Sequence, residues 1–432
     1  MLLRFRFSNF QSFRSQQEFS LLASLGPDST EDLVPVPALK ENALRTAAIY
    51  GANASGKTTV LRALQFMVEA VKNSHRLWEP NMPIPVPSFR GGPDMHAAPS
   101  EFEADFLLND VRHQYGFSLD AEGVVQESLS AFPNGKKQRW FTRERGKPIM
   151  FGRNLPGDNK TIAGLTRSNS LFVSAAAQNN HEALSAVYNW FVTRSSFVMD
   201  DRVELRIATA QICTTDEDRS AIAHLVSVAD LGIADVKLRP SDLDDPTREK
   251  VKKLIDAMIS ILEIKEPVPP ELAEPRPSLQ LLHRIAGSVV PFDLAEESNG
   301  TIAYLALLGP IRRVLSKGGA LFIDELDRSL HPIVVTYILS LFKSAATNPH
   351  GGQLVFNTHD TSLLRRGLLR RDQVWFTEKD RNGESHLYPL TDFKPRKEEN
   401  LGTGYLQGRY GAIPFINSES SIPDWDRDAE IK

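Results

Sequence analysis

The chain has 432 residues, of which 41% are hydrophobic and 24% are charged, and its formal net charge is −4. A chain of this length and apolar content can bury a large core, and we expect two or three domains or lobes. The acidic balance excludes a protein that is basic overall, as many nucleic-acid-binding proteins are, but it is compatible with a local basic patch. The single cysteine, Cys213, excludes a disulfide framework, and we expect it to be a small buried hydrophobic residue in a reducing compartment.

The N-terminal stretch MLLRFRFSNF carries two arginines and lacks a long apolar segment, so it is not the pattern of a signal peptide. No run of roughly 18 apolar residues occurs anywhere in the chain. We therefore expect no membrane span and a cytoplasmic location.

The first part of the chain alternates between strand and helix patterns. Residues 2–7 and 17–23 alternate like strands, and TAAIY at 46–50 is a short apolar run typical of a buried strand. Apolar residues then recur at helical spacing over 58–72. Residues 101–146 form alternating segments separated by Asn-Asp, Glu-Gly and Asn-Gly, which predicts an antiparallel β lobe.

The middle of the chain is predicted to be helical. Residues 170–199 lean towards helix, and amphipathic helices are expected at 216–230 and 247–262, the first capped by Thr214 or Thr215. The Pro-rich stretch EPVPPELAEPRP then marks a boundary.

The part after this boundary returns to alternating strands and helices. We expect a strand in LQLLHRI, a helix from about Thr301, and apolar strands at 320–324 and 353–358. A polar tail follows, which contains the aromatic cluster YLQGRYGAIPF. These patterns predict an α/β fold with an N-terminal part at 1–190, a small helical insert at 191–277, a C-terminal part at 278–393 and a tail at 394–432.

The stretch GANASGKT at 51–58 lies between the predicted strand and the predicted helix. In this setting the pattern G-x-x-x-x-G-K-T is specific for a phosphate-binding loop, because backbone N–H groups and the helix N-terminus cradle phosphate oxygens. The two glycines permit a close approach of the backbone. Lys57 is expected to reach the β- and γ-phosphates, and the Thr58 hydroxyl to ligate Mg²⁺. The expected phosphate-binding residues are Gly51, Ala52, Asn53, Ala54, Ser55, Gly56, Lys57, Thr58 and Thr59.

A phosphate loop that hydrolyses its nucleotide needs a carboxylate for Mg²⁺ and a group that polarises water. In ALFIDELD, Asp324 closes an apolar strand, so its carboxylate is expected at the edge of the sheet beside the loop, as a Mg²⁺ ligand. Glu325 follows and is the candidate general base. The alternative is a strand that ends in surface acids.

His359 ends a second apolar strand, in VFNTHD. The ends of parallel strands meet at one edge of a sheet, so the imidazole is a candidate hydrogen-bond partner of the γ-phosphate. A lone histidine is more often structural, but this position favours catalysis.

Taken together, GANASGKT, ESNGT, LFIDELDRSLHP and THD resemble the motifs of ABC-class ATPase heads, in the branch that contains the SMC, RecF and OLD proteins. Ser298–Gly300 resembles the S-x-G core of the ABC signature, Ser329–His331 the D-loop, and His359 the switch histidine. The opening FSNFQSF is also similar to the start of this branch. The whole chain resembles single-chain AAA-type ATP-binding proteins of bacterial anti-phage loci, such as the ATPase of the PARIS system and partners of RloB-like proteins.

The resemblance implies a fold and a mechanism. The fold is an ABC-ATPase head with a mixed or parallel P-loop core sheet, an antiparallel β lobe and a small helical insert. ATP and Mg²⁺ are held between two subunits, with Ser298 and Gly300 supplied by the second. This implies a homodimer or a larger homo-oligomer.

Two features depart from this family pattern. The glutamine that joins the Mg²⁺ ligands cannot be placed, because Gln114 and Gln126 lie in the predicted β lobe, where either is compatible with an ordinary strand residue. The insert also lacks sustained heptads, so a long coiled-coil arm is not expected.

Three uses of the ATPase compete. A sensor or scaffold that controls a separate effector protein fits the compact insert and the lack of an Asp-x-Asp nuclease pattern after His359. A DNA-repair clamp of the SMC/RecF type is the alternative, and a transporter subunit is disfavoured because EESNGT replaces the fuller signature. DNA binding is suggested by four arginines at helical spacing that could contact phosphate groups: Arg365, Arg366, Arg370 and Arg371. The alternative is that they lie on a solvated or salt-bridged face of a helix. In the tail, Tyr405, Arg409 and Tyr410 either dock a partner or pack on the head.

Overall fold

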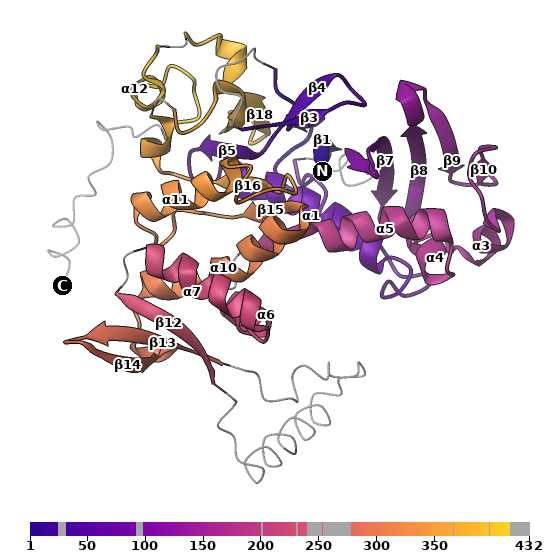
Figure 1. Cartoon of the computed structure of the whole chain (residues 1–432). Helices are drawn as coiled ribbons and strands as arrows, with labels where there is room; N and C mark the ends of the chain where they lie inside the picture. Colours follow the sequence, from indigo (N-terminus) through magenta and orange to yellow (C-terminus); the bar gives the residue numbers. More distant parts are fainter. Residues whose placement is uncertain are drawn as a thin grey trace, which may run out of the picture.

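The computed structural model of the chain describes residues 1–24, 32–91, 98–199, 202–229, 232–239, 253, 278–365, 367–396 and 398–414. These residues form two large sheets with helices between them and on the outer face (Figure 1). The expected helix at 247–262, apart from Lys253, and the Pro-rich boundary lie outside the described residues. None of the described helices is long and apolar enough to cross a membrane.

The core sheet has six strands in the order β11-β15-β16-β5-β17-β18, and only β18 is antiparallel to its neighbour. Every residue of β5, β15 and β16 is buried, because helices or the second sheet cover both faces. This confirms the predicted core. The strands are β5 (Thr46–Gly51), β11 (Ser195–Val198), β15 (Ala320–Ile323), β16 (Gln353–Asn357), β17 (Val374–Lys379) and β18 (Ser385–Pro389).

Strand β11 was not expected, because residues 170–199 lean towards helix as a whole. It pairs in parallel with β15, so Ser195–Val198 belong to the core sheet. The division into domains stays a prediction.

Alternate residues of β5 pack into two different cores. Ala47 and Ile49 face the core shared with the second sheet, whereas Ala48 and Tyr50 face the core under the outer helices. The helix after the phosphate loop, α1 (Lys57–Asn73), packs in the first of these cores, between the two sheets. The sequence pattern predicted this helix to within a residue at each end.

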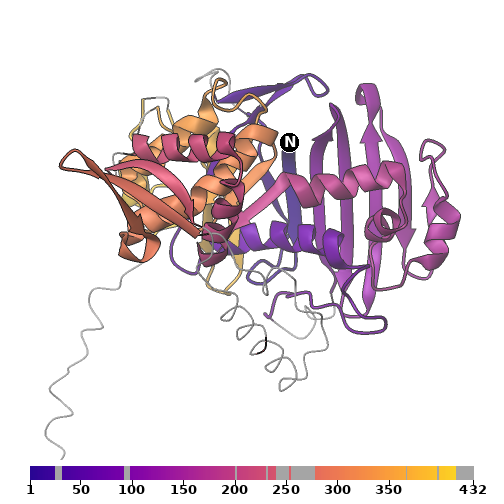
Figure 2. The same cartoon turned by 60° about the horizontal axis from the view of Figure 1, so that its bottom comes forward.

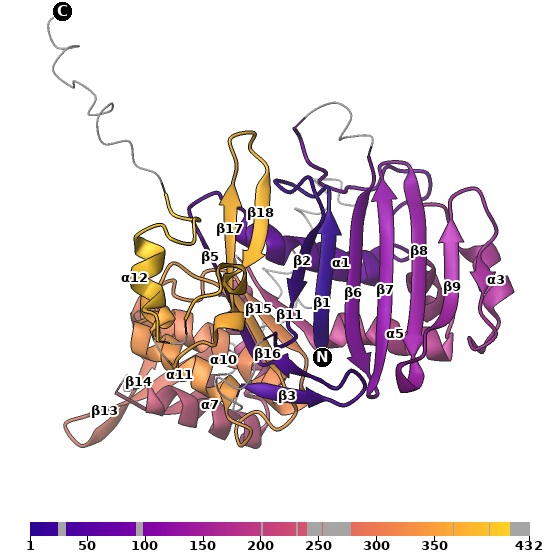
Figure 3. The same ribbon diagram turned by 90° about the horizontal axis from the view of Figure 1, so that it is seen from above.

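The second sheet is the β lobe, with seven antiparallel strands in the order β10-β9-β8-β7-β6-β1-β2 (Figure 3). This confirms the antiparallel lobe and adds the N-terminal hairpin to it. The strands are β1 (Leu2–Ser8), β2 (Gln17–Ser20), β6 (Ser100–Leu108), β7 (Val111–Asp120), β8 (Gly123–Phe132), β9 (Gln138–Glu144) and β10 (Met150–Phe151). A small separate hairpin consists of β3 (Leu33–Val36) and β4 (Glu41–Leu44).

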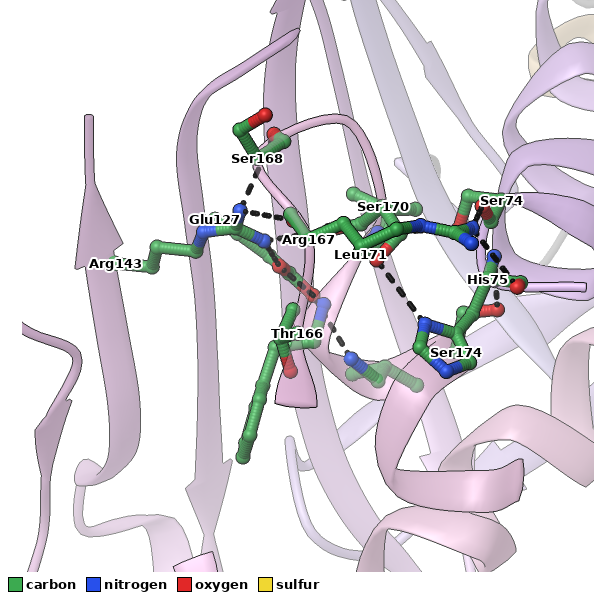
Figure 4. Close-up of polar contacts among 12 residues, drawn as sticks. Ser74, His75, Glu127, Arg143, Thr166, Arg167, Ser168, Ser170, Leu171 and Ser174 are labelled. Atoms are coloured by element: carbon green, nitrogen blue, oxygen red, sulfur yellow. Dashed lines mark hydrogen bonds and ion pairs between the residues drawn. The ribbon is translucent and has the colours of Figure 1, made fainter. Parts of the chain in front are cut away.

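A buried polar network fastens the end of α1 to this lobe (Figure 4). The Arg143 guanidinium donates to the carbonyl of Ser170 at 2.6 Å and lies 3.5 Å from the Glu127 carboxylate. Arg167 in turn donates to the carbonyls of Ser74 and His75, at 3.1 and 2.9 Å. Burial raises the pKa of Glu127, while Arg143 and two backbone N–H groups oppose that rise. Because Arg167 and Arg143 each donate to several backbone carbonyls, the network holds the P-loop helix at its far end.

The remaining helices before residue 195 pack in the core shared with the second sheet, and those from residue 202 onwards pack in the core on the other face of the core sheet (Figures 1 and 2). Thr215 caps α7, as predicted, by accepting from the Asp218 N–H at 3.2 Å. Cys213 is buried, as expected, and burial raises its pKa to about 11. The helices are α3 (Asn159–Leu165), α4 (Phe172–Gln178), α5 (Glu182–Arg194), α6 (Arg202–Ile212), α7 (Asp216–Val228), α10 (Asn299–Lys317), α11 (Pro332–Lys343) and α12 (Leu401–Leu406). A three-stranded sheet of β12 (Ile233–Arg239), β13 (Ser278–Ile285) and β14 (Ser288–Asp293) adjoins α7.

The arginine-rich segment is not an α-helix, which corrects the sequence expectation. It contains two 3-10 turns, and Gly367, at φ +89°, separates them. Arg370 is buried and pairs with Asp372 at 2.8 Å, while Arg371 donates to the carbonyl of Pro395 at 2.5 Å. These two guanidinium groups are therefore engaged within the fold. Arg366 lies outside the described residues.

The aromatic tail packs on its own head. Tyr405 and Tyr410 are 7% and 1% exposed, and the Tyr405 ring lies 5.7 Å from that of Tyr50, just before the phosphate loop. Arg409 is largely exposed and pairs with Glu399. Of the two readings of the tail, the described residues therefore support packing for both tyrosines.

We expect Tyr405→Ala to lower the free energy of unfolding by about 3 kcal/mol, because it removes a buried ring from this cluster. Leu406→Ala, next to it and 65% exposed, is the matched control and should change stability by less than about 0.5 kcal/mol. Chemical denaturation measures both. Equal effects of the two substitutions would contradict the packing role of Tyr405.

Candidate nucleotide-binding site

The phosphate loop joins β5 to α1 and has little space for larger residues. A Cβ on Gly51 would lie 2.5 Å from the Ser55 hydroxyl and from the Thr377 carbonyl. Gly56 caps α1 at φ +115°, a conformation that disfavours L side chains. Ala54 also has a left-handed conformation, at φ +60°. The glycines are thus required by contact and conformation, as the sequence pattern predicted.

Lys57 is buried against this loop, and its ammonium donates to the carbonyls of Gly51 and Ala52 at 2.9 and 3.0 Å. Burial lowers its pKa, and the nearby Glu325 and Asp324 carboxylates oppose that fall. The buried ammonium is therefore bound by two neutral carbonyl groups. An anion such as a phosphate would bind it more strongly, because a charged acceptor forms a stronger hydrogen bond with an ammonium.

Asp324 and Thr58 meet, as predicted from strand order. The Thr58 hydroxyl donates to both oxygens of the Asp324 carboxylate, at 2.9 and 3.2 Å. A hydroxyl and a carboxylate are hard oxygen donors of the kind that Mg²⁺ prefers, so this pair fits such an ion.

Asn357 was not predicted from the sequence, and it holds the acidic pair in place. Its amide donates to the Asp324 carboxylate and accepts from the Glu325 backbone N–H. Glu325 has φ +52°, an unfavourable left-handed conformation that turns the chain after β15. Its side chain is about half exposed and lies 3.9 Å from Arg328. Asn357 could have been predicted from its place as the last residue of β16, because that strand lies beside β15 and ends close to the end of β15.

His359 lies at the same edge, and its backbone N–H donates to the Asp327 carboxylate at 3.4 Å. Desolvation and the Lys57 charge lower its pKa, while Asp327 and Glu325 oppose that effect. The lowered pKa favours the neutral imidazole, which has one donor and one acceptor nitrogen.

A pocket of about 220 Å³ lies over the loop and the start of α1, and Gln11, Ser12 and Lys379 complete its lining. The Thr59 hydroxyl donates to the Gln11 side chain at 3.2 Å. A second pocket, of about 530 Å³, continues from the same three residues towards Arg62 and Arg90.

The glutamine beside the loop is thus Gln11, in FSNFQSF. Gln114 and Gln126 lie on β7 and β8 of the lobe and do not line this pocket.

The signature residues lie apart from the pocket. Ser298 caps α10 by accepting from the Thr301 N–H at 3.1 Å, and it is exposed. A Cβ on Gly300 would lie 3.1 Å from the Ser329 carbonyl, which brings the signature and the D-loop segment together. Neither Ser298 nor Gly300 lines the phosphate pocket of its own chain.

The parallel core sheet, the phosphate loop and the acidic strand end define a P-loop ATPase of the AAA type. Residues 47–365 match the family described as "AAA domain, putative AbiEii toxin, Type IV TA system", and the chain belongs to this family.

No curated protein sequence matches the chain. Among solved structures, an SMC head bound to the C-terminal winged-helix domain of ScpA is 12% identical, with a TM-score of 0.45, and the match covers 90% of this chain and 97% of the other. The SMC head domain from Thermotoga maritima is 13% identical, with a TM-score of 0.40 and coverages of 90% and 98%.

We expect Gln11→Ala to weaken nucleotide binding by about tenfold, because it removes a polar group from the pocket lining. Gln126→Ala deletes the same side chain in the lobe and is expected to leave the Kd unchanged. Titration with a fluorescent ATP analogue in the presence of Mg²⁺ measures both. If Gln126→Ala weakened nucleotide binding and Gln11→Ala did not, the assignment of Gln11 to the pocket would be contradicted.

Proposed function

We propose that the chain hydrolyses ATP and that each complete site forms between two copies of it. The observation that carries this proposal is the separation of the motifs. The loop and Thr58 line one pocket and Thr58 donates to Asp324, whereas Ser298 and Gly300 do not line that pocket and lie at an exposed helix start. A second subunit that presents Ser298 to this pocket would add a hydroxyl and a helix N-terminus to the γ-phosphate.

In this mechanism Lys57 exchanges its carbonyl acceptors for β- and γ-phosphate oxygens. Thr58 and Asp324 would hold Mg²⁺, which neutralises phosphate charge when it is bound. Glu325, half exposed beside the pocket, accepts a proton from the attacking water. The neutral His359 donates a hydrogen bond to the γ-phosphate. Asn357 keeps the two carboxylates in their separate places.

The γ-phosphate is the group that distinguishes the two states of this switch. It is contacted from both subunits in the closed dimer, so ATP stabilises closure and ADP cannot do so to the same extent. ATP is favoured over GTP by resemblance to the family, since the chain contains no N-K-x-D guanine motif.

We further propose that the switch is a sensor or scaffold in anti-phage defence, which controls a separate effector protein. Two observations support this role. The motifs resemble those of the PARIS and RloB-associated ATPases, and the description of the matching family names a Type IV toxin–antitoxin system. The alternative, a DNA clamp of the SMC/RecF type, loses its main sequence argument, because Arg370 and Arg371 are engaged within the fold.

Mixing two inactive variants tests the shared site. Lys57→Ala removes the phosphate contact, and Ser298→Arg blocks the contact that the partner supplies. Each variant alone should be inactive, while an equal mixture should regain about a quarter of wild-type phosphate release, since half of randomly paired dimers contain one intact site. A mixture as inactive as its components would contradict a shared site.

The effector role is tested with Glu325→Gln, which should keep ATP bound and the closed state populated. We would express this variant with its neighbouring genes, purify it in ATP and Mg²⁺, and identify by mass spectrometry what accompanies it. A stoichiometric second protein that leaves after hydrolysis by the wild-type chain is the expected result. Nuclease-sensitive DNA without a protein partner would favour the clamp instead.

A further inference from the structure

The loop that precedes the signature serine is held at both of its ends by β13. At the first end, Gln280 donates to the Asp293 carboxylate at 2.8 Å, and Arg239 on β12 lies 3.0 Å from the same group. At the second end, the His283 Nε2 lies 2.6 Å from the Glu297 carboxylate. Glu297 directly precedes Ser298.

These two attachments differ in their surroundings. The Asp293 side chain is about half exposed, and exposed ion pairs contribute little to stability. The Glu297 and His283 side chains are 6% and 18% exposed, and the His283 ring also packs 4.7 Å from that of Phe292. The contact at Glu297 is therefore the more rigid of the two, and it is the one next to the signature.

Contacts from both faces of β13 restrict the conformation of the loop from Asp293 to Glu297. Gln280 and His283 are three residues apart, so their side chains leave β13 on opposite faces. The loop from Asp293 to Glu297 contains one 3-10 turn, Leu294–Glu296. A hydrogen bond from the Asp293 N–H to the Glu296 carboxylate, at 2.8 Å, closes this turn. Its path is thus set before Ser298 begins α10.

We propose that His283 is a positioning residue for the shared ATP site: it holds Glu297 and thereby aims the Ser298 hydroxyl and the start of α10 at the partner's γ-phosphate. His283 acts through Glu297, and its effect falls on the site of the other subunit. This inference rests on the shared site proposed above. A displacement of about 1 Å in such a group costs up to roughly a hundredfold in rate.

The variant mixture described above gives a test that a merely structural role would not pass. In that mixture the Lys57→Ala chain supplies the working signature, and the Ser298→Arg chain supplies the working phosphate loop. His283→Leu added to the Lys57→Ala chain should lower phosphate release about tenfold. The same substitution added to the Ser298→Arg chain should change it less than about twofold, because the signature of that chain is already blocked.

Two further variants serve as controls. His283→Gln keeps a donor to Glu297 and should restore most of the activity. Arg284→Leu changes the exposed neighbour on the same strand and should have no effect in either chain. An equal loss whichever chain carries His283→Leu, or no loss in either, overturns the proposal.

A measurement on the nucleotide-free protein separates this inference from the shared site. The Thr301 N–H donates to Ser298, so its hydrogen exchange reports whether the cap is in place. If the reference mixture is inactive, the shared site fails, and His283 can still be judged by this exchange rate. His283→Leu should speed exchange at Thr301 about tenfold relative to wild type and to Arg284→Leu, and an unchanged rate overturns the role of His283.

Discussion

The parallel register of β15, β16 and β5 is the constraint on which the site depends. Ile323 pairs with Phe356, and Asn357 pairs with Ile49, so β15 and β16 end within one residue of each other and β5 runs two residues further, to Gly51. The residues that follow each strand then meet at one edge without any long side chain reaching across the sheet. The Asn357 amide fixes this arrangement, because it binds both the Asp324 carboxylate and the backbone at Glu325.

This edge provides only half of what phosphoryl transfer needs. It offers a cation, hard oxygen donors and a candidate base, but the γ-phosphate in such a site would face open solvent on one side. The exposed start of α10 has the complementary properties: a helix N-terminus and the Ser298 hydroxyl, placed beside the D-loop segment at Ser329. Pairing of two chains would unite the halves, exclude water and make closure depend on the bound nucleotide.

Local sequence signals predicted the elements whose neighbours in space are also near in sequence. The strand, glycines and helix around Lys57 follow from a pattern of fewer than thirty residues, and Asp324 and His359 follow from apolar runs that end in polar residues. Gln11 was missed because its place depends on a contact between distant segments, in which the Ser385 N–H donates to the Ser12 carbonyl. No periodicity reveals such a contact.

Two expectations were wrong for physical reasons. Helical spacing of the arginines was overridden by the turn at Gly367 and by the buried pair of Arg370 with Asp372, which satisfies its charge locally. Strand β11 was hidden because it is four residues long and follows a helix directly. In both cases tertiary contacts outweighed a weak local preference.

The central claim is that ATP brings two copies of the chain together, and the mass of the particle in solution tests it most directly. Light scattering after size exclusion would be applied to the Glu325→Gln chain with ATP and Mg²⁺, and then with ADP and Mg²⁺. A mass of at least twice that of the chain with ATP, returning towards the lower value with ADP, is the predicted result. A particle of one chain with ATP demonstrably bound would contradict the account.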